Sequence, residues 1–265
     1  MSDKQKGDTK DEDLWADGES GHAPDAMRRR ILAMAGSAIA LTLVPGVTLF
    51  ARDLQGKRTT KGADKGPVRY GLLIDARHCQ TDCDACVHAC QTYNGLSGKD
   101  GPDHAQWIRK VTITDPKTRF TRSFPVMCQH CADAACVAVC PTGASFKRPD
   151  GIVLVDKHRC IGCRYCLMAC PYKARSFVGH TLTDQKPWAP RGKGTAEGCT
   201  MCVERVMKGR VPACVEACQK TGHKAMVFGN LHDPKSAIAQ KLADVATTTI
   251  RADLGMGPSV HYRGI

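Results

Sequence analysis

The sequence has few aromatic side chains, with only 6 Phe, 5 Tyr and 3 Trp among 265 residues. Aromatic rings supply much of the buried area of an ordinary core, so something besides hydrophobic packing must organise much of this chain. An apolar fraction of 42% excludes a chain that is disordered throughout. A mean hydropathy of −0.30 excludes a polytopic membrane protein.

Motifs of several common functions are missing. No Cys-x2-Cys pair is followed by His, which excludes covalent attachment of a c-type haem. We find no paired carboxylates, activated nucleophile or phosphate-binding loop, and Gly192-Lys193-Gly194 is too short for a nucleotide motif. The sequence therefore predicts a protein with no substrate chemistry of its own.

Cysteine, in contrast, is abundant: there are 16, and they form four groups of four with none left over. Group one is Cys79, Cys83, Cys86 and Cys90, and group two is Cys128, Cys131, Cys136 and Cys140. Group three is Cys160, Cys163, Cys166 and Cys170, and group four is Cys199, Cys202, Cys214 and Cys218.

Group three has the spacing C-x2-C-x2-C-x3-C-P of bacterial iron–sulfur loops, in which the last Cys binds the other cluster of a pair. The first three thiolates can surround one face of a compact cluster, and the fourth starts a helical turn that points its sulfur away. Cys140-Pro141-Thr142-Gly143-Ala144 is echoed by Cys170-Pro171-Tyr172-Lys173-Ala174, which indicates an internal duplication of groups two and three.

Other uses of the cysteines remain open at this point. Zinc prefers four ligands in two separated pairs and has no use for a crossed fourth Cys. Disulfides would have to join cysteines that lie close together in one loop. The run Cys79-x3-Cys83-x2-Cys86 matches radical SAM enzymes, but the chain has no room for their full barrel.

The charge is unevenly distributed. Residues 1–27 hold three Lys against eight Asp or Glu, whereas residues 52–265 hold 32 Lys or Arg against 18 Asp or Glu. Sixteen thiolates around four cluster cores would contribute a charge of about −8. Much of the basic surplus then compensates buried negative charge, and we expect no nucleic-acid partner.

The start of the chain predicts an export signal. Arg28-Arg29-Arg30 precede an uncharged run from Ile31 to Ala51, which resembles a twin-arginine leader. Pro45-Gly46 interrupts this run, which suits a signal better than a spanning helix, although a retained anchor or a buried helix remains open. Because the twin-arginine route transports folded proteins, it allows a metal cofactor to be loaded in the reducing cytoplasm. We therefore expect a periplasmic location at the inner membrane.

Short strands are predicted before several cysteine loops, over residues 70–75, 107–114, 124–127 and 151–155. Ile238, Leu242 and Val245 are three or four residues apart and predict one amphipathic helix in the tail. No run in residues 52–265 resembles a membrane span, so membrane association is expected to occur through partners.

The roles of nearby His and basic residues are ambiguous. His78, His130 and His158 lie beside cysteines, but each group already has four sulfurs, so we expect them near the clusters or at the surface. Four basic residues near group three either temper cluster charge or are solvated. They are Lys157, Arg159, Arg164 and Arg175.

The whole pattern resembles the four-cluster, ferredoxin-like iron–sulfur subunits of respiratory complexes over about residues 70–232. The residues that carry this resemblance include Cys128-Gln129-His130-Cys131, Cys140-Pro141, Cys160-Ile161-Gly162-Cys163, Cys199-Thr200-Met201-Cys202, Pro212-Ala213-Cys214 and Phe228-Gly229-Asn230-Leu231. The family implies an α+β fold of duplicated ferredoxin-like domains with short strands and cysteine-rich loops. It also implies four 4Fe-4S clusters.

The resemblance implies a ligand set for each cluster. One set is Cys79, Cys83, Cys86 and Cys218, and its neighbour is Cys199, Cys202, Cys214 and Cys90. A third is Cys128, Cys131, Cys136 and Cys170, and the fourth is Cys160, Cys163, Cys166 and Cys140. Two features depart from the family pattern. Group one has three residues between its first two cysteines rather than two, and Cys218 is followed by Gln219 rather than by Pro.

Within the family, the leader and the strand Trp107-Ile108-Arg109-Lys110 are most similar to the DsrO type, which belongs to a membrane complex of dissimilatory sulfur metabolism. This implies an NrfD-like (DsrP-like) quinone-interacting membrane partner, a multihaem cytochrome c (DsrJ-like) and other Dsr subunits. Two alternatives remain: an iron–sulfur subunit of an exported molybdopterin oxidoreductase, such as a polysulfide or tetrathionate reductase, and a structural metal or disulfide protein.

The expected organisation has four parts. Residues 1–51 form an acidic extension with the signal, and residues 52–69 form a basic linker. Residues 70–232 form the four-cluster domain, with residues 120–180 as its inner ferredoxin unit. Residues 233–265 form a tail with a short helix.

Overall fold

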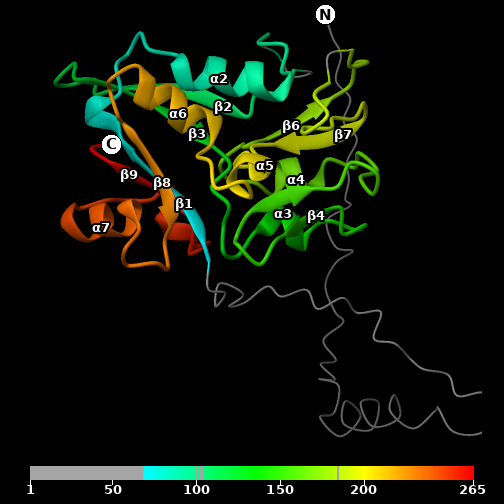
Figure 1. The fold of residues 1–265 in the computed structure, drawn as a ribbon. Helices are drawn as coiled ribbons and strands as arrows, with labels where there is room; N and C mark the ends of the chain where they lie inside the picture. The colour runs from blue at the N-terminus through cyan, green and yellow to red at the C-terminus, as the bar shows by residue number, and fades with distance from the viewer. Residues whose placement is uncertain (1–67, 100, 102–103, 184) are drawn as a thin grey trace, which may run out of the picture. The chain divides into compact units, whose positions relative to one another are not determined.

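The computed structural model describes residues 68–99, 101, 104–183 and 185–265 (Figure 1). The predicted leader, including Arg28 and Arg29, and nearly all of the predicted linker lie outside these residues. Among the helices of the described ranges, none has the length and apolar character needed to span a bilayer.

The largest sheet of the described fold has three strands in the order β8-β1-β9. β1 (Tyr70–Asp75) pairs antiparallel with β8 (Met226–Asn230) and parallel with β9 (Val260–Arg263). In Figure 1 the cyan strand β1 therefore lies between orange and red strands from the other end of the chain. The four central residues of β1 are buried, as expected for a strand that is covered on both faces.

Helix α7 (Ala237–Asp244) packs against this sheet. Ser236 caps it, because its Oγ accepts a hydrogen bond from the backbone N–H of Ala239 at 3.2 Å. Ile238 is fully buried, and a Cβ atom at Gly229 would lie only 2.9 Å from its Cγ2 atom. A glycine in β8 thus lets the helix approach the sheet closely.

The remaining strands form three short antiparallel pairs. β2 (Ile108–Thr114) pairs with β3 (Thr121–Met127). β4 (Ser145–Lys147) pairs with β5 (Val153–Val155), and β6 (Arg175–Val178) pairs with β7 (Thr195–Gly198). All of these strands except β2 begin or end within five residues of a cysteine, so the pairs position the cysteine loops.

Most of the helices carry cysteines. α2 (Ala85–Asn94) packs beside α6 (Ala213–Lys220), whereas α3 (Ala135–Ala138), α4 (Tyr165–Met168) and α5 (Val203–Val206) are single turns. Two 3-10 turns, η1 (Ala76–His78) and η2 (Ala252–Leu254), complete the described elements.

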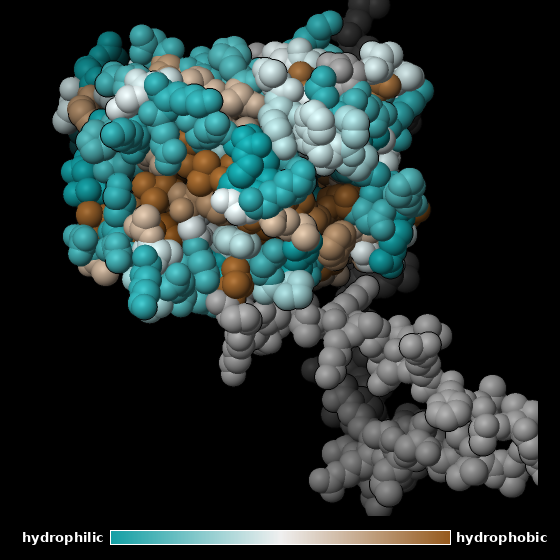
Figure 2. All heavy atoms as spheres, viewed as in Figure 1, coloured by the Kyte–Doolittle hydropathy of each residue, from teal (hydrophilic) through white to brown (hydrophobic). Residues whose placement is uncertain are grey.

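Two buried clusters form the core, and cysteines belong to both. The first surrounds β1, β2 and β3 and includes Cys86, Cys90, Cys214 and Cys218. The second includes Cys128, Cys131, Cys136, Cys166 and Cys170. On the face shown in Figure 2, apolar residues gather in recesses between hydrophilic rims.

The fold confirms an α+β class with short strands. β1 has the predicted bounds, β2 and β5 begin one and two residues later than predicted, and β3 begins three residues earlier. The helix predicted in the tail is α7. β9 is not predicted by the sequence, and its pairing with β1 makes the tail part of the central sheet.

Candidate functional site

Site one, as we call it, is formed by Cys79, Cys83, Cys86 and Cys218, which line one small cavity. The first three lie around the start of α2, and α6 brings Cys218 beside them from the other end of the fold. Burial, followed by the neighbouring Cys79 and Cys218, raises the pKa of the Cys86 thiol to about 12.

Lys110 holds the loop of site one. Its Nζ donates hydrogen bonds to the carbonyl oxygens of Gln80, Thr81 and Cys83 at 2.6, 2.6 and 2.7 Å. These carbonyls belong to the stretch that contains the extra residue of group one. A side chain from β2 thus fixes the loop in which this chain departs from the family pattern.

Site two is formed by Cys90, Cys199, Cys202 and Cys214, which also line one cavity. The buried side chain of Asn94 donates to the Cys90 Sγ at 3.5 Å, and the Met201 N–H donates to the Cys199 Sγ at 3.4 Å. Burial raises the pKa values of Cys199 and Cys214 well above the usual range, and nearby thiols, including Cys90, raise them further.

Site three is formed by Cys128, Cys131, Cys136 and Cys170, which lie in one buried cluster together with Cys166 of site four. Burial raises the pKa of Cys131 to about 12, and its three partners add to this effect. The Arg175 Nη2 donates to the Cys136 Sγ at 3.3 Å.

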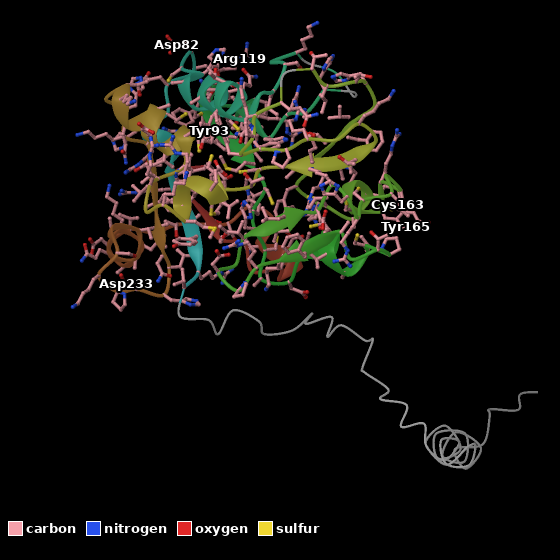
Figure 3. The ribbon with its side chains drawn as sticks, turned by 45° about the vertical axis from the view of Figure 1, so that its right-hand side comes forward. Asp82, Tyr93, Arg119, Cys163, Tyr165 and Asp233 are labelled. Carbon is pink, nitrogen blue, oxygen red and sulfur yellow. The ribbon has the colours of Figure 1, made fainter. Side chains whose placement is uncertain are left out.

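Site four is formed by Cys140, Cys160, Cys163 and Cys166, which line a further cavity. The Ser145 N–H donates to the Cys140 Sγ at 3.3 Å, and the Ala196 N–H donates to the Cys160 Sγ at 3.4 Å. Burial opposes ionisation of Cys140, but hydrogen bonds from Ser145 and Thr142 outweigh it and lower the pKa. Cys163 is the one cysteine of the sixteen that is exposed (Figure 3).

The donor sets of the four sites fit iron–sulfur groups. All sixteen cysteines are described, and none forms a disulfide. Within the described ranges, no three His, Cys, Asp or Glu side chains are arranged to hold a single metal ion. Each site instead gathers four sulfurs, and N–H donors point at several of them, as they do at cluster thiolates. The four sets are those that the resemblance implies, while their role as ligands stays a prediction.

Comparisons with known proteins agree with this chemistry. A family model described as a 4Fe-4S dicluster domain matches residues 119–231. Iron–sulfur subunit 1 of an Hdr-like menaquinol oxidoreductase from Archaeoglobus fulgidus is 37% identical over 265 residues, which cover 89% of this chain and 97% of that protein. The chain belongs to the ferredoxin-type iron–sulfur subunit family.

Other relatives have similar lengths and identities. NrfC from Escherichia coli is 38% identical over 82% of this chain and 90% of its own length. A subunit of the tetrathionate reductase from Salmonella typhimurium is 36% identical over 74% of this chain and 73% of its own length. This iron–sulfur subunit therefore binds 4Fe-4S clusters and transfers electrons within an oxidoreductase complex, and it is not an enzyme by itself.

The histidines beside the cysteines belong to none of the four sites. His78 and His158 are exposed. His130 is buried, and its Nδ1 accepts a hydrogen bond from the Val153 N–H at 3.0 Å. Burial lowers the pKa of His130 to about 3, and the nearby Arg175 contributes to the shift, so this ring is neutral.

The structure separates the four basic residues that the sequence left ambiguous. Arg159 is exposed and donates to the Thr142 carbonyl, and the exposed Arg164 lies over the ring of Phe177. Lys157 donates to the Ala196 carbonyl. Arg175 alone among them donates to a cysteine sulfur.

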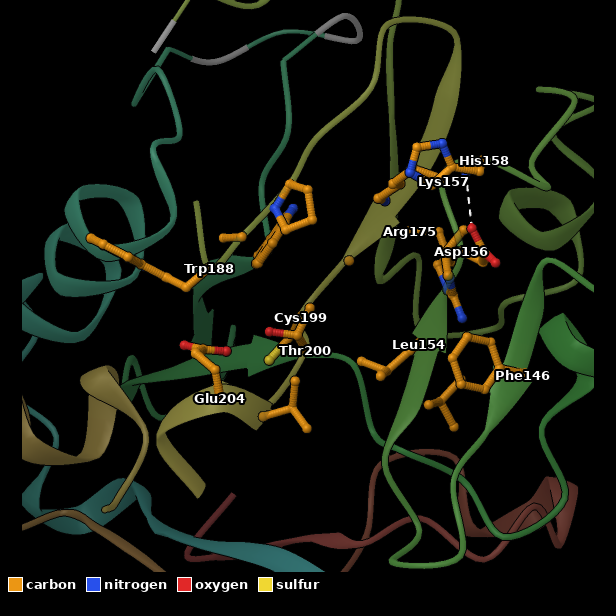
Figure 4. A pocket seen from close by; sticks show the side chains of 17 residues that line it. Phe146, Leu154, Asp156, Lys157, His158, Arg175, Trp188, Cys199, Thr200 and Glu204 are labelled. Atoms are coloured by element: carbon orange, nitrogen blue, oxygen red, sulfur yellow. Dashed lines mark hydrogen bonds between the residues drawn. The ribbon is translucent and has the colours of Figure 1, made fainter. Parts of the chain in front are cut away.

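A cavity of about 310 Å³ lies beside site two (Figure 4). Cys199 and Arg175 line it, together with mainly apolar side chains such as Phe146, Leu154 and Trp188. The Asp156 carboxylate accepts a hydrogen bond from the backbone N–H of His158 at 2.9 Å at one edge. Its wall thus includes one cysteine of site two and the arginine that donates to Cys136 of site three.

Sequence reasoning missed a buried polar network beside this cavity. Glu197 is fully buried and forms an ion pair with Arg191 at 3.1 Å. Asn94, which donates to Cys90, was missed as well. Nothing in the sequence marks Glu197, because its partner Trp107 lies 90 positions away. Asn94 follows Cys90 by one turn of α2, and that i, i+4 spacing is the signal that could have found it.

Proposed function

We propose that this protein relays single electrons through four 4Fe-4S clusters, one at each of the four sites. The observation that carries the proposal is the gathering of four sulfurs at every site, with no cysteine left over. A bound cluster supplies one-electron exchange, and the protein supplies ligands, burial and hydrogen bonds that set the potential.

The sites follow one another as a chain. Cys86 of site one and Cys90 of site two are one helical turn apart on α2 and interact electrostatically. Besides burial, the charge of Cys128 of site three raises the pKa of Cys199 of site two, so these two sites are neighbours. In the same way, Cys136 of site three raises the pKa of Cys166 of site four. We therefore propose the electron path one, two, three, four.

The repeated elements around sites three and four support the finer view of a duplicated ferredoxin unit. Cys136 and Cys166 lie on the single-turn helices α3 and α4. Each turn is followed by a Cys-Pro step and a short strand, β4 or β6. The repeat Cys140-Pro141 and Cys170-Pro171 thus coincides with a repeat of local structure.

One end of the path reaches the surface at Cys163, beside exposed apolar residues. Ile161 is 67% exposed, Tyr165 53% and Met168 69%. Figure 3 shows Cys163 and Tyr165 close together. Exposed apolar side chains around a redox site are typical of a contact surface for a partner. We propose that electrons enter or leave the protein here.

For the partner, we propose an NrfD-like membrane subunit that reacts with quinone, in a DsrO-like complex that also contains a DsrJ-like multihaem cytochrome c. Similarity to a subunit of a menaquinol oxidoreductase supports the quinol link. Arg28-Arg29 support a periplasmic location through twin-arginine export. Similarity to the tetrathionate reductase subunit favours a second candidate, an iron–sulfur subunit of an exported molybdopterin reductase.

Two measurements test these proposals. Protein purified anaerobically should contain about sixteen iron and sixteen sulfide, because each cubane has four of each. A reproducible value near half of that or less would contradict four clusters. A pull-down from solubilised membranes should recover a quinone-reactive membrane protein, and recovery of a molybdopterin subunit would favour the second candidate.

A further inference from the structure

Arg175 lies at the start of β6 with its guanidinium in the protein interior. It is 8% exposed. Its Nη2 donates to the Cys136 Sγ at 3.3 Å and to the Ser145 Oγ at 3.0 Å. These partners lie on α3 and β4, so hydrogen bonds to two different elements hold the guanidinium in place.

Arg175 differs from the other buried arginines in its counter-charge. Arg191 is paired with Glu197, and Arg205 is paired with Glu216. Among the described residues, no carboxylate forms an ion pair with Arg175, whose hydrogen-bond acceptors are a sulfur and a hydroxyl. A buried cation without an anion is costly, so its counter-charge must come from the cysteine sulfurs.

These sulfurs belong to two sites. Cys128, Cys136 and Cys166 lie in one buried cluster, and α4, which carries Cys166, packs against β6, which begins at Arg175. In keeping with this arrangement, the charges of these three sulfurs outweigh burial and raise the pKa of the guanidinium. Cys128 and Cys136 belong to site three, whereas Cys166 belongs to site four. The hydrogen bond is made only to site three.

We propose that Arg175 is the internal counterion of sites three and four and raises the reduction potential of both, more strongly at site three. This rests on the proposed function. Reduction adds one electron at a site, and no bond forms or breaks and no proton moves. A fixed positive charge stabilises the more negative reduced state, and a hydrogen bond to a ligand sulfur acts in the same direction.

The test is a redox titration of the full-length, cluster-loaded protein followed by EPR. In Arg175→Gln the equilibrium constant for reduction at site three should fall at least tenfold, which is about 59 mV for one electron. The fall at site four should be smaller. Arg175→Lys keeps a positive charge and should give an intermediate value at site three. A Cys170→Ser variant identifies the site-three signal.

Arg159→Gln and Arg164→Gln serve as matched controls, since both remove an exposed positive charge next to a cysteine of site four in the sequence. They should leave both potentials unchanged. Unchanged potentials in Arg175→Gln with full iron content would overturn the proposal, and so would equal shifts in the controls.

If Arg175→Gln loses iron, the site-three potentials of Ser145→Ala and Arg175→Lys test the proposal instead. Ser145→Ala removes one hydrogen bond that holds the guanidinium and retains the charge. A lower site-three potential in either variant supports the proposal, and unchanged potentials in both overturn it. Failure of the proposed function would appear separately, as unmutated protein without the expected iron.

Discussion

The indole N–H of Trp107 donates a hydrogen bond to Glu197 Oε2 at 3.2 Å in the protein interior. The same carboxylate pairs with Arg191, whose Nη1 donates to the Gly95 carbonyl at 2.7 Å. Trp107 precedes β2, Glu197 lies on β7 and Gly95 ends α2. One buried charge pair thus joins three elements that surround sites two and four.

We expect Glu197→Ala to destabilise the fold strongly, because it leaves Arg191 buried without its anion. The cost for a broken buried pair is about 3–5 kcal/mol. Anaerobic thermal unfolding followed by circular dichroism measures it. Asp253→Ala is the control, since it breaks an exposed pair with Arg251, and it should leave the unfolding temperature unchanged. Equal effects of the two substitutions would argue against a structural role of the buried pair.

Cys170→Ser should alter the cluster of site three and leave that of site four intact, although Cys170 belongs to group three in the sequence. The structure places its side chain with Cys128, Cys131 and Cys136. Cys166→Ser should have the opposite effect. EPR of the two variants distinguishes the sites, and conversion of the site-four signal by Cys170→Ser would show that the assignment of the fourth ligands is wrong.

Gly162→Ala should disrupt the loop that carries Cys160 and Cys163. A Cβ atom at Gly162 would lie 2.4 Å from the Gly194 carbonyl oxygen, and the residue has a φ of +72°. Gly209→Ala is a matched control, because Gly209 has a φ of +70° but nothing within 4 Å of its Cβ position. Backbone strain is therefore common to both, and only Gly162→Ala adds a clash. Iron content should fall in Gly162→Ala alone. An equal loss of iron in Gly209→Ala would show that backbone strain, and not the clash, causes the effect.

Tyr262→Ala should destabilise the central sheet by about 3–5 kcal/mol, as large-to-small changes of buried aromatic residues do. Tyr262 is fully buried on β9, and its ring lies edge-on against Phe124. Tyr262→Phe removes only the hydroxyl, which bonds to Gln129 and the Pro125 carbonyl, and should cost about 1 kcal/mol. Loss of stability measured by thermal unfolding should follow this order. A Tyr262→Ala variant as stable as Tyr262→Phe would show that β9 contributes little.

Replacement of Arg28-Arg29 by Lys-Lys should keep the protein in the cytoplasm with its clusters assembled, because loading precedes translocation by this route. Cell fractionation combined with iron analysis measures both. Continued export of the variant would point to a different pathway.

Local sequence patterns predicted the elements whose residues alternate or repeat over short distances. Residues 70–75 are rich in apolar side chains and form β1 with the predicted bounds. The spacing of Ile238 and Leu242 predicted α7. The cysteine spacing predicted four groups, because a cluster loop is itself a local structure.

The remaining features depend on contacts between distant parts of the chain. β9 has only four residues and is stabilised by β1, which lies nearly 190 positions earlier by the pairing of Leu72 with Val260. The spacing also could not show that Cys163 is exposed, since all four cysteines of group three look alike in sequence. The separation of Arg175 from Arg159 and Arg164 likewise depends on which side chains the fold buries.

The position of β1 between β8 and β9 bears on how the protein is made. On the ribosome, β1 emerges first among these strands, and both of its neighbours emerge last. Its backbone N–H and C=O groups therefore lack sheet partners until β8 and β9 have emerged. Cys218 of site one and Cys214 of site two both lie on α6, so these two sites can be completed only after α6 has emerged. We expect this half of the protein to fold only after β8 and β9 have been synthesised, with the nascent chain needing protection from aggregation until then.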